Sequence, residues 1–295
     1  MDVEPGRRSV TLDDGPSLSL VEHAPAAAEP DAPPFVLVHG LSSNARTWDG
    51  VGQALAAAGR QAWAVDLRGH GRSDKPDDGY DIATVARDVC ELIDQLSPSS
   101  VVLAGQSWGG NVVMEAAARC PERIAAVAGV DGGAIRLRSA FPTWEGCARQ
   151  LAPPPLAGTP ASDMERYLRA AHPDWPESGI SGTMANFEVR DDGTVAPWLT
   201  RERHMRVLRG LWEHDPLAIF PSIARPALLI AAGPSDAGPP AATRRQWFTE
   251  AATRLPAGRL VELPDADHDV HAQHPDDVAT LLQELAATAS SGPGA

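Results

Sequence analysis

The chain has 295 residues, and its 39 Asp and Glu residues outnumber its 25 Lys and Arg residues to give a formal net charge of −14. Binding to nucleic acid or to an anionic membrane surface needs a basic patch, so this balance argues against both kinds of partner. The length is enough to bury a large α/β core and still carry an insertion.

The cysteines Cys90, Cys120 and Cys147 are odd in number, widely spaced and without a C-x-x-C pattern. We therefore expect neither a disulfide framework nor a zinc site. The N-terminus lacks a basic segment followed by an apolar one, and no apolar run reaches the length of a membrane span. These features favour a soluble protein of the cytoplasm, which is a reducing compartment. They are also compatible with a homodimer.

Apolar and polar residues alternate in Arg8–Leu12 and Ser17–Glu22, on either side of an Asp-Asp-Gly-Pro turn. This pattern predicts an antiparallel hairpin at a sheet edge. Buried strands and helices then alternate along the chain, which predicts an α/β fold with a mostly parallel sheet of about eight strands and helices on both faces. The further strands that we expect are Phe35–Val38, Ala62–Leu67, Val101–Ala104, Ile124–Val130, Ala227–Ala232 and Arg259–Leu263. The helices that we expect run from about Trp48 to Gly59, from about Ile82 to Leu96, onward from Gly110, near Ala241–Arg254, and from Pro275 to about Ala287.

The segment 134–220 interrupts this alternation. It has no buried-strand pattern, a Pro-rich break, and short helical patches at Met164–Ala171 and Glu202–Trp212. We predict a core formed by residues 1–133 and 221–295, with 134–220 inserted as a helical domain at the carboxyl ends of the strands, where such sheets bind ligands. Its Met and Trp side chains are compatible both with an apolar substrate pocket and with a small core of its own.

Ser107 lies in Gly105-Gln106-Ser107-Trp108-Gly109, a G-x-S-x-G pattern with a buried strand before it and a helix after it. The glycines allow the sharp turn that exposes the serine hydroxyl at the end of the sheet. The free N–H groups of the following helix favour a developing negative charge. This context predicts that Ser107 is a nucleophile.

A serine nucleophile needs a base and a carboxylate that orients the base. Of the histidines that follow the last strand, His268 lies nearest the strand end and is the expected base, with His271 in reserve and His274 expected at the start of the last helix. Asp236 follows the penultimate strand and is the favoured acid. Asp131, which follows an earlier strand, is the alternative acid.

The oxyanion needs two backbone N–H donors. Trp108, the residue after the nucleophile, would supply one. Leu41, in the His39-Gly40-Leu41 loop after an early strand, would supply the other, with His39 hydrogen-bonded beneath the loop as a structural residue.

Together these features resemble the α/β-hydrolase fold superfamily, over residues Arg8 to Ala287. The resemblance rests on four patterns in the family's order: His39-Gly40, the Asp66–Ser73 segment with its glycines, the elbow at Ser107, and the late Asp…His pair. It implies that 134–220 is a cap that roofs the active site and selects the substrate. A Trp after the nucleophile is also similar to haloalkane dehalogenases and epoxide hydrolases, but those families use an aspartate where this chain has Ser107.

We therefore predict a serine hydrolase that cleaves a carboxylic ester, lactone or thioester of a small, largely apolar acyl substrate, with no cofactor and no metal. Three alternatives stay open. The same triad could hydrolyse a carbon–carbon bond, or transfer or cyclise an acyl group; the fold could serve a non-catalytic ligand receptor or a lyase; or the chain could belong to the dehalogenase and epoxide-hydrolase branch.

Overall fold

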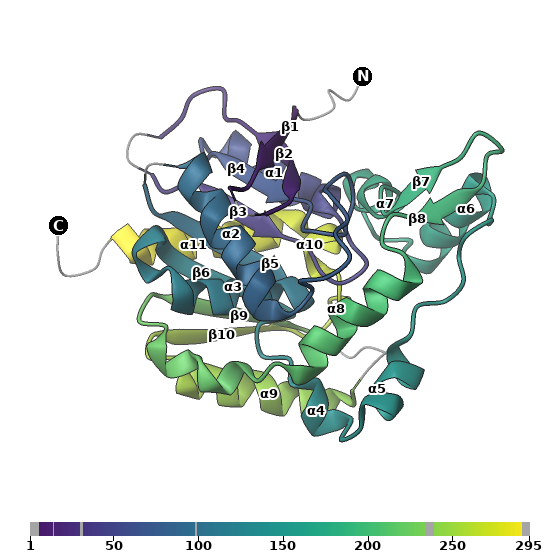
Figure 1. Cartoon of the computed structure of the whole chain (residues 1–295). Coiled ribbons are helices and arrows are strands. Elements are labelled where there is room, and N and C mark those ends of the chain that lie inside the picture. Colours follow the sequence, from purple (N-terminus) through teal and green to yellow (C-terminus); the bar gives the residue numbers. More distant parts are fainter. Residues whose placement is uncertain (1–5, 14, 30–31, 98, 234–238, 291–295) are drawn as a thin grey trace.

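In a computed structural model, which describes residues 6–13, 15–29, 32–97, 99–233 and 239–290, the chain is built on an eight-stranded sheet (Figure 1). The sheet begins with an antiparallel hairpin, and its remaining six strands run parallel to one another. This confirms the predicted fold class. The spatial order of the strands is β1 (Arg7–Thr11), β2 (Ser17–His23), β4 (Ala62–Val65), β3 (Phe35–Val38), β5 (Val101–Gln106), β6 (Ile124–Val130), β9 (Ala227–Ala232) and β10 (Gly258–Leu263).

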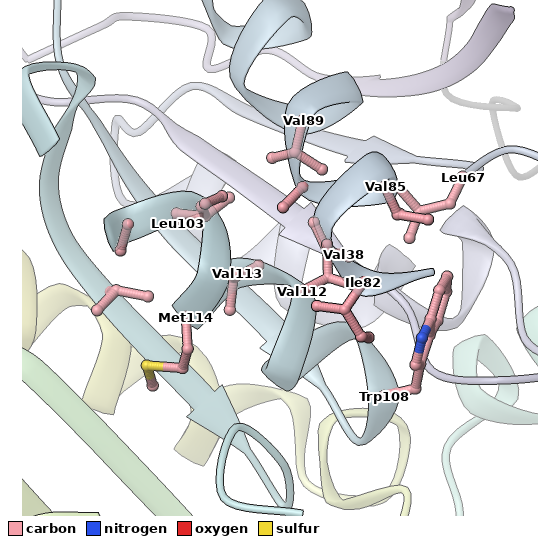
Figure 2. Close-up of a cluster of buried hydrophobic side chains, with 14 of the residues drawn as sticks. Val38, Leu67, Ile82, Val85, Val89, Leu103, Trp108, Val112, Val113 and Met114 are labelled. Carbon is pink, nitrogen blue, oxygen red and sulfur yellow. The ribbon is translucent and has the colours of Figure 1, made fainter. Parts of the chain in front are cut away.

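Helices cover both faces of the sheet because successive strand residues point to opposite sides. Along β5, Leu103 faces a cluster with α2 (Ile82–Leu96), α3 (Trp108–Arg119) and α9 (Ala241–Arg254). Its neighbour Val102 faces the opposite cluster, with α1 (Asp49–Ala57) and α11 (Pro275–Ser290). Figure 2 shows the first cluster, in which valines of α2 and α3 pack against Val38 and Leu103. Each such buried side chain stabilises the fold by about 1.5–3 kcal/mol.

The segment between β6 and β9 forms two groups of elements. One group packs on the main core through Leu137, Val207 and Trp212, whereas the other has a small core of its own that includes Met164 and Trp175. These Met and Trp side chains therefore serve packing. The first group is α4 (Leu137–Ala140), α5 (Trp144–Leu151) and α8 (Arg201–Glu213); the second is α6 (Ala161–Ala171), α7 (Glu177–Met184), β7 (Phe187–Val189) and β8 (Val195–Pro197).

The strands β7 and β8 form a two-stranded antiparallel sheet in a segment that the sequence predicts to be helical. Each has only three residues, and Glu188 and Val189 are exposed, so neither strand has the apolar run that marks a buried strand. The division of the chain into a core and a cap at 134–220 stays a prediction. Short helical turns complete the described elements: η1 (Ala45–Trp48), η2 (Pro121–Arg123), η3 (Pro216–Ala218), η4 (Phe220–Ser222) and α10 (Val270–Gln273). None of the helices in the described ranges is both long and apolar enough to cross a membrane.

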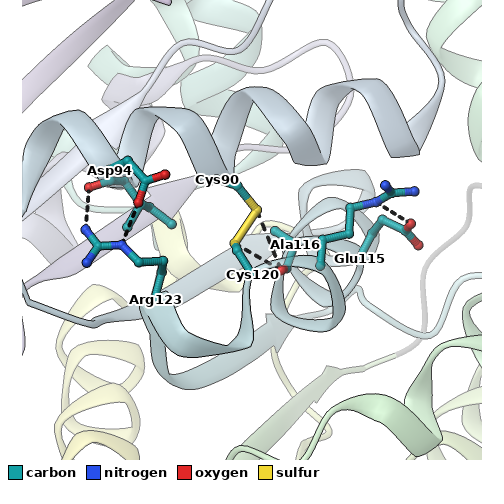
Figure 3. The surroundings of a disulfide bond; sticks show 8 residues. Cys90, Asp94, Glu115, Ala116, Cys120 and Arg123 are labelled. Carbon is teal, nitrogen blue, oxygen red and sulfur yellow. Dashed lines mark hydrogen bonds and ion pairs between the residues drawn. A yellow bond between two sulfur atoms is a disulfide. The ribbon is translucent and has the colours of Figure 1, made fainter.

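A disulfide joins Cys90 of α2 to Cys120, which follows α3 (Figure 3). The prediction of no disulfide was wrong. The two cysteines are 30 residues apart in sequence and meet only because α2 packs beside α3, which the spacing of the cysteines does not reveal. Cys147 is free and buried, and burial raises the pKa of its thiol to about 11. Because two of the three cysteines form a disulfide, the cysteine pattern no longer supports the expectation of a reducing compartment.

Two buried histidines should make the fold sensitive to acid. Burial lowers the pKa of His271 to about 4, and burial with the nearby charge of Arg46 does the same to His23. In the unfolded chain these two histidines take up protons below about pH 6.5, whereas in the folded chain they do so only below about pH 4. The free energy of unfolding should therefore fall by about 2 kcal/mol per histidine between pH 7.5 and pH 5.

Urea denaturation of the wild type and of His271→Phe at these two pH values checks this expectation. Phe keeps a ring against Trp48, whose ring centroid lies 4.5 Å from that of His271, but it cannot titrate. The variant should lose about 2 kcal/mol less than the wild type over this interval. Equal losses in the two proteins would assign the acid sensitivity to other groups.

Candidate active site

Ser107 occupies the sharp turn between β5 and α3. Its φ of 52° and ψ of −120° hold the backbone in a conformation that costs a non-glycine residue free energy. The turn is tight enough that a Cβ on Gly105 would overlap the carbonyl group of Gly109. Hydrogen bonds from Ser107 N–H to the Val130 carbonyl (3.0 Å) and from Gly110 N–H to the Ser107 carbonyl (2.9 Å) hold it in place.

His268 follows β10 and lies between the serine and a carboxylate. Its Nε2 is 3.0 Å from Ser107 Oγ, and its Nδ1 is 2.5 Å from Asp131 Oδ2. Since a carboxylate only accepts, Nδ1–H donates to Asp131, and Nε2 is left to accept the serine hydroxyl proton. The three side chains thus form one directional chain of hydrogen bonds.

Among the described residues, the carboxylate that contacts His268 is that of Asp131, the alternative acid in the sequence. Asp236 lies outside the described residues. The sequence favoured Asp236 because it follows the penultimate strand along the chain. Contact with His268 depends instead on which strands are neighbours in the sheet. β6 lies directly beside β5, so the residue that follows β6 emerges next to Ser107. A positive φ of 40° and a hydrogen bond from Ala232 N–H to Oδ1 (3.0 Å) fix Asp131.

The other two histidines of this segment do not contact Ser107. His271 is fully buried in α10 against Trp48, and neither ring nitrogen has a hydrogen-bond partner among the described residues. His274 precedes α11 and accepts a hydrogen bond from Val278 N–H through its backbone carbonyl, as expected for a residue at the start of a helix.

The surroundings of His268 favour its protonated form. Withdrawal of the ring from water is the largest single effect and lowers the pKa of His268. The hydrogen bond and charge of Asp131, with the charge of Asp269, outweigh it, while Arg244 opposes them; the net effect raises the pKa of His268 above its usual value. The imidazolium that forms when His268 takes a proton is thereby stabilised.

The loop after β3 approaches Ser107 closely. A Cβ on Gly40 would lie 3.2 Å from the Cβ of Ser107. His39 supports the loop from beneath, because its Nδ1–H donates to the Gly40 carbonyl (2.8 Å) and its Nε2 accepts from Leu67 N–H (3.0 Å). This is the structural role that the sequence suggested for His39. Leu41 follows Gly40 in this loop and packs against the core cluster that includes Leu103 and Trp108.

Trp108 is the first residue of α3, and the first N–H groups of a helix have no partner within the helix. Its side chain is fully buried in the core, as Figure 2 shows, and its ring lies 5.4 Å from that of His70. The indole group therefore packs in the core behind the site.

Asp267, the residue before His268, ties the histidine loop to the segment between α6 and α7. Its Oδ2 accepts a hydrogen bond from Trp175 Nε1 (3.0 Å) and lies 3.2 Å from His172 Nδ1. Its backbone N–H donates to Gln273 Oε1 (2.6 Å). Sequence reasoning missed these contacts, because the partners of Asp267 in that segment lie 92 and 95 residues away and no local pattern links them.

A model of the α/β-hydrolase family matches residues 35–281, so the chain belongs to this family. Its named relatives include several hydrolases, and this chain is a hydrolase of the same fold. The 2-(acetamidomethylene)succinate hydrolase of Mesorhizobium japonicum is 28% identical over 245 residues, which cover 83% of this chain and 84% of that protein. Epoxide hydrolase A of Mycobacterium tuberculosis is 31% identical over 187 residues, 58% of this chain and little more than half of that protein (57%).

Solved structures agree on the fold. The crystal structure of E-2-(acetamidomethylene)succinate hydrolase superposes with a TM-score of 0.80 at 22% identity, covering 95% of this chain and 98% of that one. The enol-lactonase from Burkholderia xenovorans superposes with a TM-score of 0.68 at 23% identity, covering 95% of this chain and all of that one (100%). At these identities the likeness concerns the fold.

Proposed function

We propose that this chain is a serine hydrolase that cleaves a carboxylic ester, lactone or thioester through an acyl-enzyme. The observation that carries the proposal is the chain of contacts from Ser107 Oγ through the His268 ring to Asp131. In the first step, Ser107 Oγ attacks the acyl carbon while its proton passes to His268 Nε2. His268 then gives that proton to the leaving oxygen or sulfur as its bond to the acyl carbon breaks.

Water completes the cycle in the second step. His268 accepts a proton from water as the hydroxide oxygen attacks the acyl carbon, and it returns the proton to Ser107 Oγ as the acid product leaves. Asp131 keeps the imidazole in the tautomer that both steps need. The N–H groups of Leu41 and Trp108 are proposed to donate to the oxyanion of each tetrahedral intermediate.

The choice of a serine hydrolase over an epoxide hydrolase rests on residue 107. Opening an epoxide in the manner described for those families requires a carboxylate nucleophile, and Ser107 occupies that position. The name of one relative, 2-(acetamidomethylene)succinate hydrolase, supports hydrolysis at a carboxylic acid derivative. We propose that the substrate carries a small, largely apolar acyl group.

Intact mass after treatment with an alkyl fluorophosphonate tests this proposal. We expect one adduct on the wild type and none on Ser107→Ala, because the reagent needs an activated serine with its base in place. Product analysis with a panel of esters, lactones and thioesters then separates hydrolysis from acyl transfer. A well-folded wild type that forms no adduct would contradict the proposal and favour a receptor or a lyase.

His204 of α8 supports the loop that carries Leu41. Its Nδ1 lies 2.6 Å from Ser42 Oγ, and Ser42 has a φ of 63°. Burial lowers the pKa of His204, so the ring is neutral near pH 7. Its Nε2–H donates to the Leu151 carbonyl (3.3 Å), and Nδ1 therefore accepts from the Ser42 hydroxyl.

His204→Leu should lower kcat for an ester substrate roughly 10- to 100-fold with a smaller change in KM, because a displaced oxyanion donor affects the transition state most. His204→Asn, which can still accept from Ser42 near the position of Nδ1, should retain most of kcat. Steady-state kinetics of both variants check this. Equal loss in Leu and Asn variants, or a change confined to KM, would show that His204 does not hold the loop.

A further inference from the structure

Arg244 is an unexpected neighbour of the triad. It lies in the first half of α9, and its Nη2 contacts Oδ2 of Asp131, the same oxygen that accepts from His268 Nδ1. Its Nη1 donates to the carbonyl of Gly233, the residue after β9 (3.2 Å). The side chain is 13% exposed, and that of Asp131 is 0% exposed. A permanent cation therefore shares a buried carboxylate with the histidine.

This arrangement has an electrostatic consequence for the base. A carboxylate oxygen that already pairs with a guanidinium attracts a proton on the neighbouring imidazole less strongly. In this site Asp131 and Asp269 favour the protonated form of His268, and Arg244 acts against them. Without Arg244, the histidine would hold its proton to higher pH and would be unable to activate the serine there.

We propose that Arg244 is a positioning residue. It pairs with the Asp131 oxygen that also accepts from His268, weakens the attraction of that carboxylate for the proton on His268, and so sets the pH above which Ser107 becomes reactive. This proposal rests on the proposed function and concerns the regulation of the same site. Arg244 touches neither Ser107 nor the reacting atoms, and it acts only through Asp131.

The other titratable groups that act on the His268 ring are two carboxylates and one histidine. Asp131 approaches from the end of β6, Asp269 belongs to the histidine's own loop, and His271 of α10 lies behind it. Burial lowers the pKa of His271 to about 4, so it is neutral over the range in which the triad works. Arg244 is thus the cation whose charge, among the largest effects on His268, lowers the pKa of the ring.

The pH dependence of serine labelling tests the proposal without knowledge of the substrate. The second-order rate constant for modification of Ser107 by an alkyl fluorophosphonate is measured from pH 5 to pH 9 for the wild type, Arg244→Gln, Arg244→Met and Arg244→Lys. Both neutral variants should shift the midpoint of the profile upward by roughly 0.5 to 1 pH unit. This shift corresponds to about three- to tenfold slower labelling on the acid side of the midpoint, and the plateau at high pH should be similar to that of the wild type. Arg244→Lys keeps the charge and should stay near the wild-type midpoint.

Arg245→Gln is the matched control. Arg245 is the next residue of the same helix, is exposed, and pairs with Glu262 at 3.0 Å, away from Asp131. Its midpoint should equal that of the wild type. Circular dichroism confirms that each variant is folded, and the two neutral variants provide independent measurements if one of them unfolds.

A lower plateau with an unchanged midpoint in the neutral variants would show that Arg244 only supports the fold and would overturn the proposal. A shift in Arg244→Lys as large as that in Arg244→Gln would overturn it too, since charge would not be the cause. The failure of the proposed function looks different: the wild type would then not be labelled at any pH, or Ser107→Ala would be labelled as well.

Discussion

Ser107→Ala should abolish ester turnover, with a fall in kcat of about 10⁴- to 10⁶-fold, because the step that forms the acyl-enzyme has no nucleophile without the hydroxyl. The residual rate would come from water attack on an ester held by the oxyanion donors alone. Kinetics with an activated ester, such as a nitrophenyl ester, measure the loss.

The fold of this variant should persist. The alanine would keep the φ of 52° that Ser107 already adopts, so the substitution adds no backbone strain and removes only the hydroxyl that His268 contacts. Circular dichroism and the thermal midpoint should match the wild type. Activity within tenfold of the wild type in a folded variant would show that Ser107 is not the nucleophile.

Asp131→Asn should lower kcat by roughly 10³- to 10⁴-fold. An amide in place of the carboxylate can donate to Nδ1 of His268, which would then carry its proton on Nε2 and could not accept from Ser107. Asn adopts a positive φ as readily as Asp does, so the backbone at φ 40° should be retained. The loss should appear in kcat and in the rate of fluorophosphonate labelling alike.

Asp236→Asn is the informative comparison for this variant, since Asp236 is the acid that the sequence favoured. With Asp131 hydrogen-bonded to His268, we expect Asp236→Asn to keep its activity within a few-fold of the wild type. A 10³-fold loss in Asp236→Asn together with an active Asp131→Asn would return the role of the acid to Asp236.

The strained backbone conformations of the molecule gather at this site. Among the described residues, the non-glycine residues with positive φ are Ser42, Ser107 and Asp131. They lie in the loop beside Leu41, at the nucleophile and at the carboxylate that contacts the base. Such conformations cost about 1–3 kcal/mol each and persist only where surrounding contacts impose them. Here the hydrogen bonds of Ser42 with His204, of Ser107 with Val130 and of Asp131 with Ala232 supply those contacts.

Local patterns in the sequence were enough to predict the fold class and the position of most elements. Apolar runs of four to seven residues marked β3, β5, β6 and β9, and the spacing in Ile82–Leu96 marked α2 with the same bounds as the structure. The elbow was also predictable, because the glycines, the serine and the start of α3 lie within six residues of one another. The proximity of His268 to Ser107 followed from its place at the end of the last strand.

The tertiary structure alone decided the partner of His268, the disulfide and the contact of Arg244 with Asp131. Each joins residues 30 or more positions apart, and each depends on which strands and helices are neighbours. Asp131 and Asp236 both follow a parallel strand, so their local sequences could not rank them. The position of β6 beside β5 places Asp131 next to Ser107. The sequence by itself determined the elements and the chemical groups they carry, because those depend on the residues within a few positions. Only the packing of the sheet determined which of these groups meet, because hydrogen bonds and charge interactions act over a few ångströms of space whatever the distance along the chain.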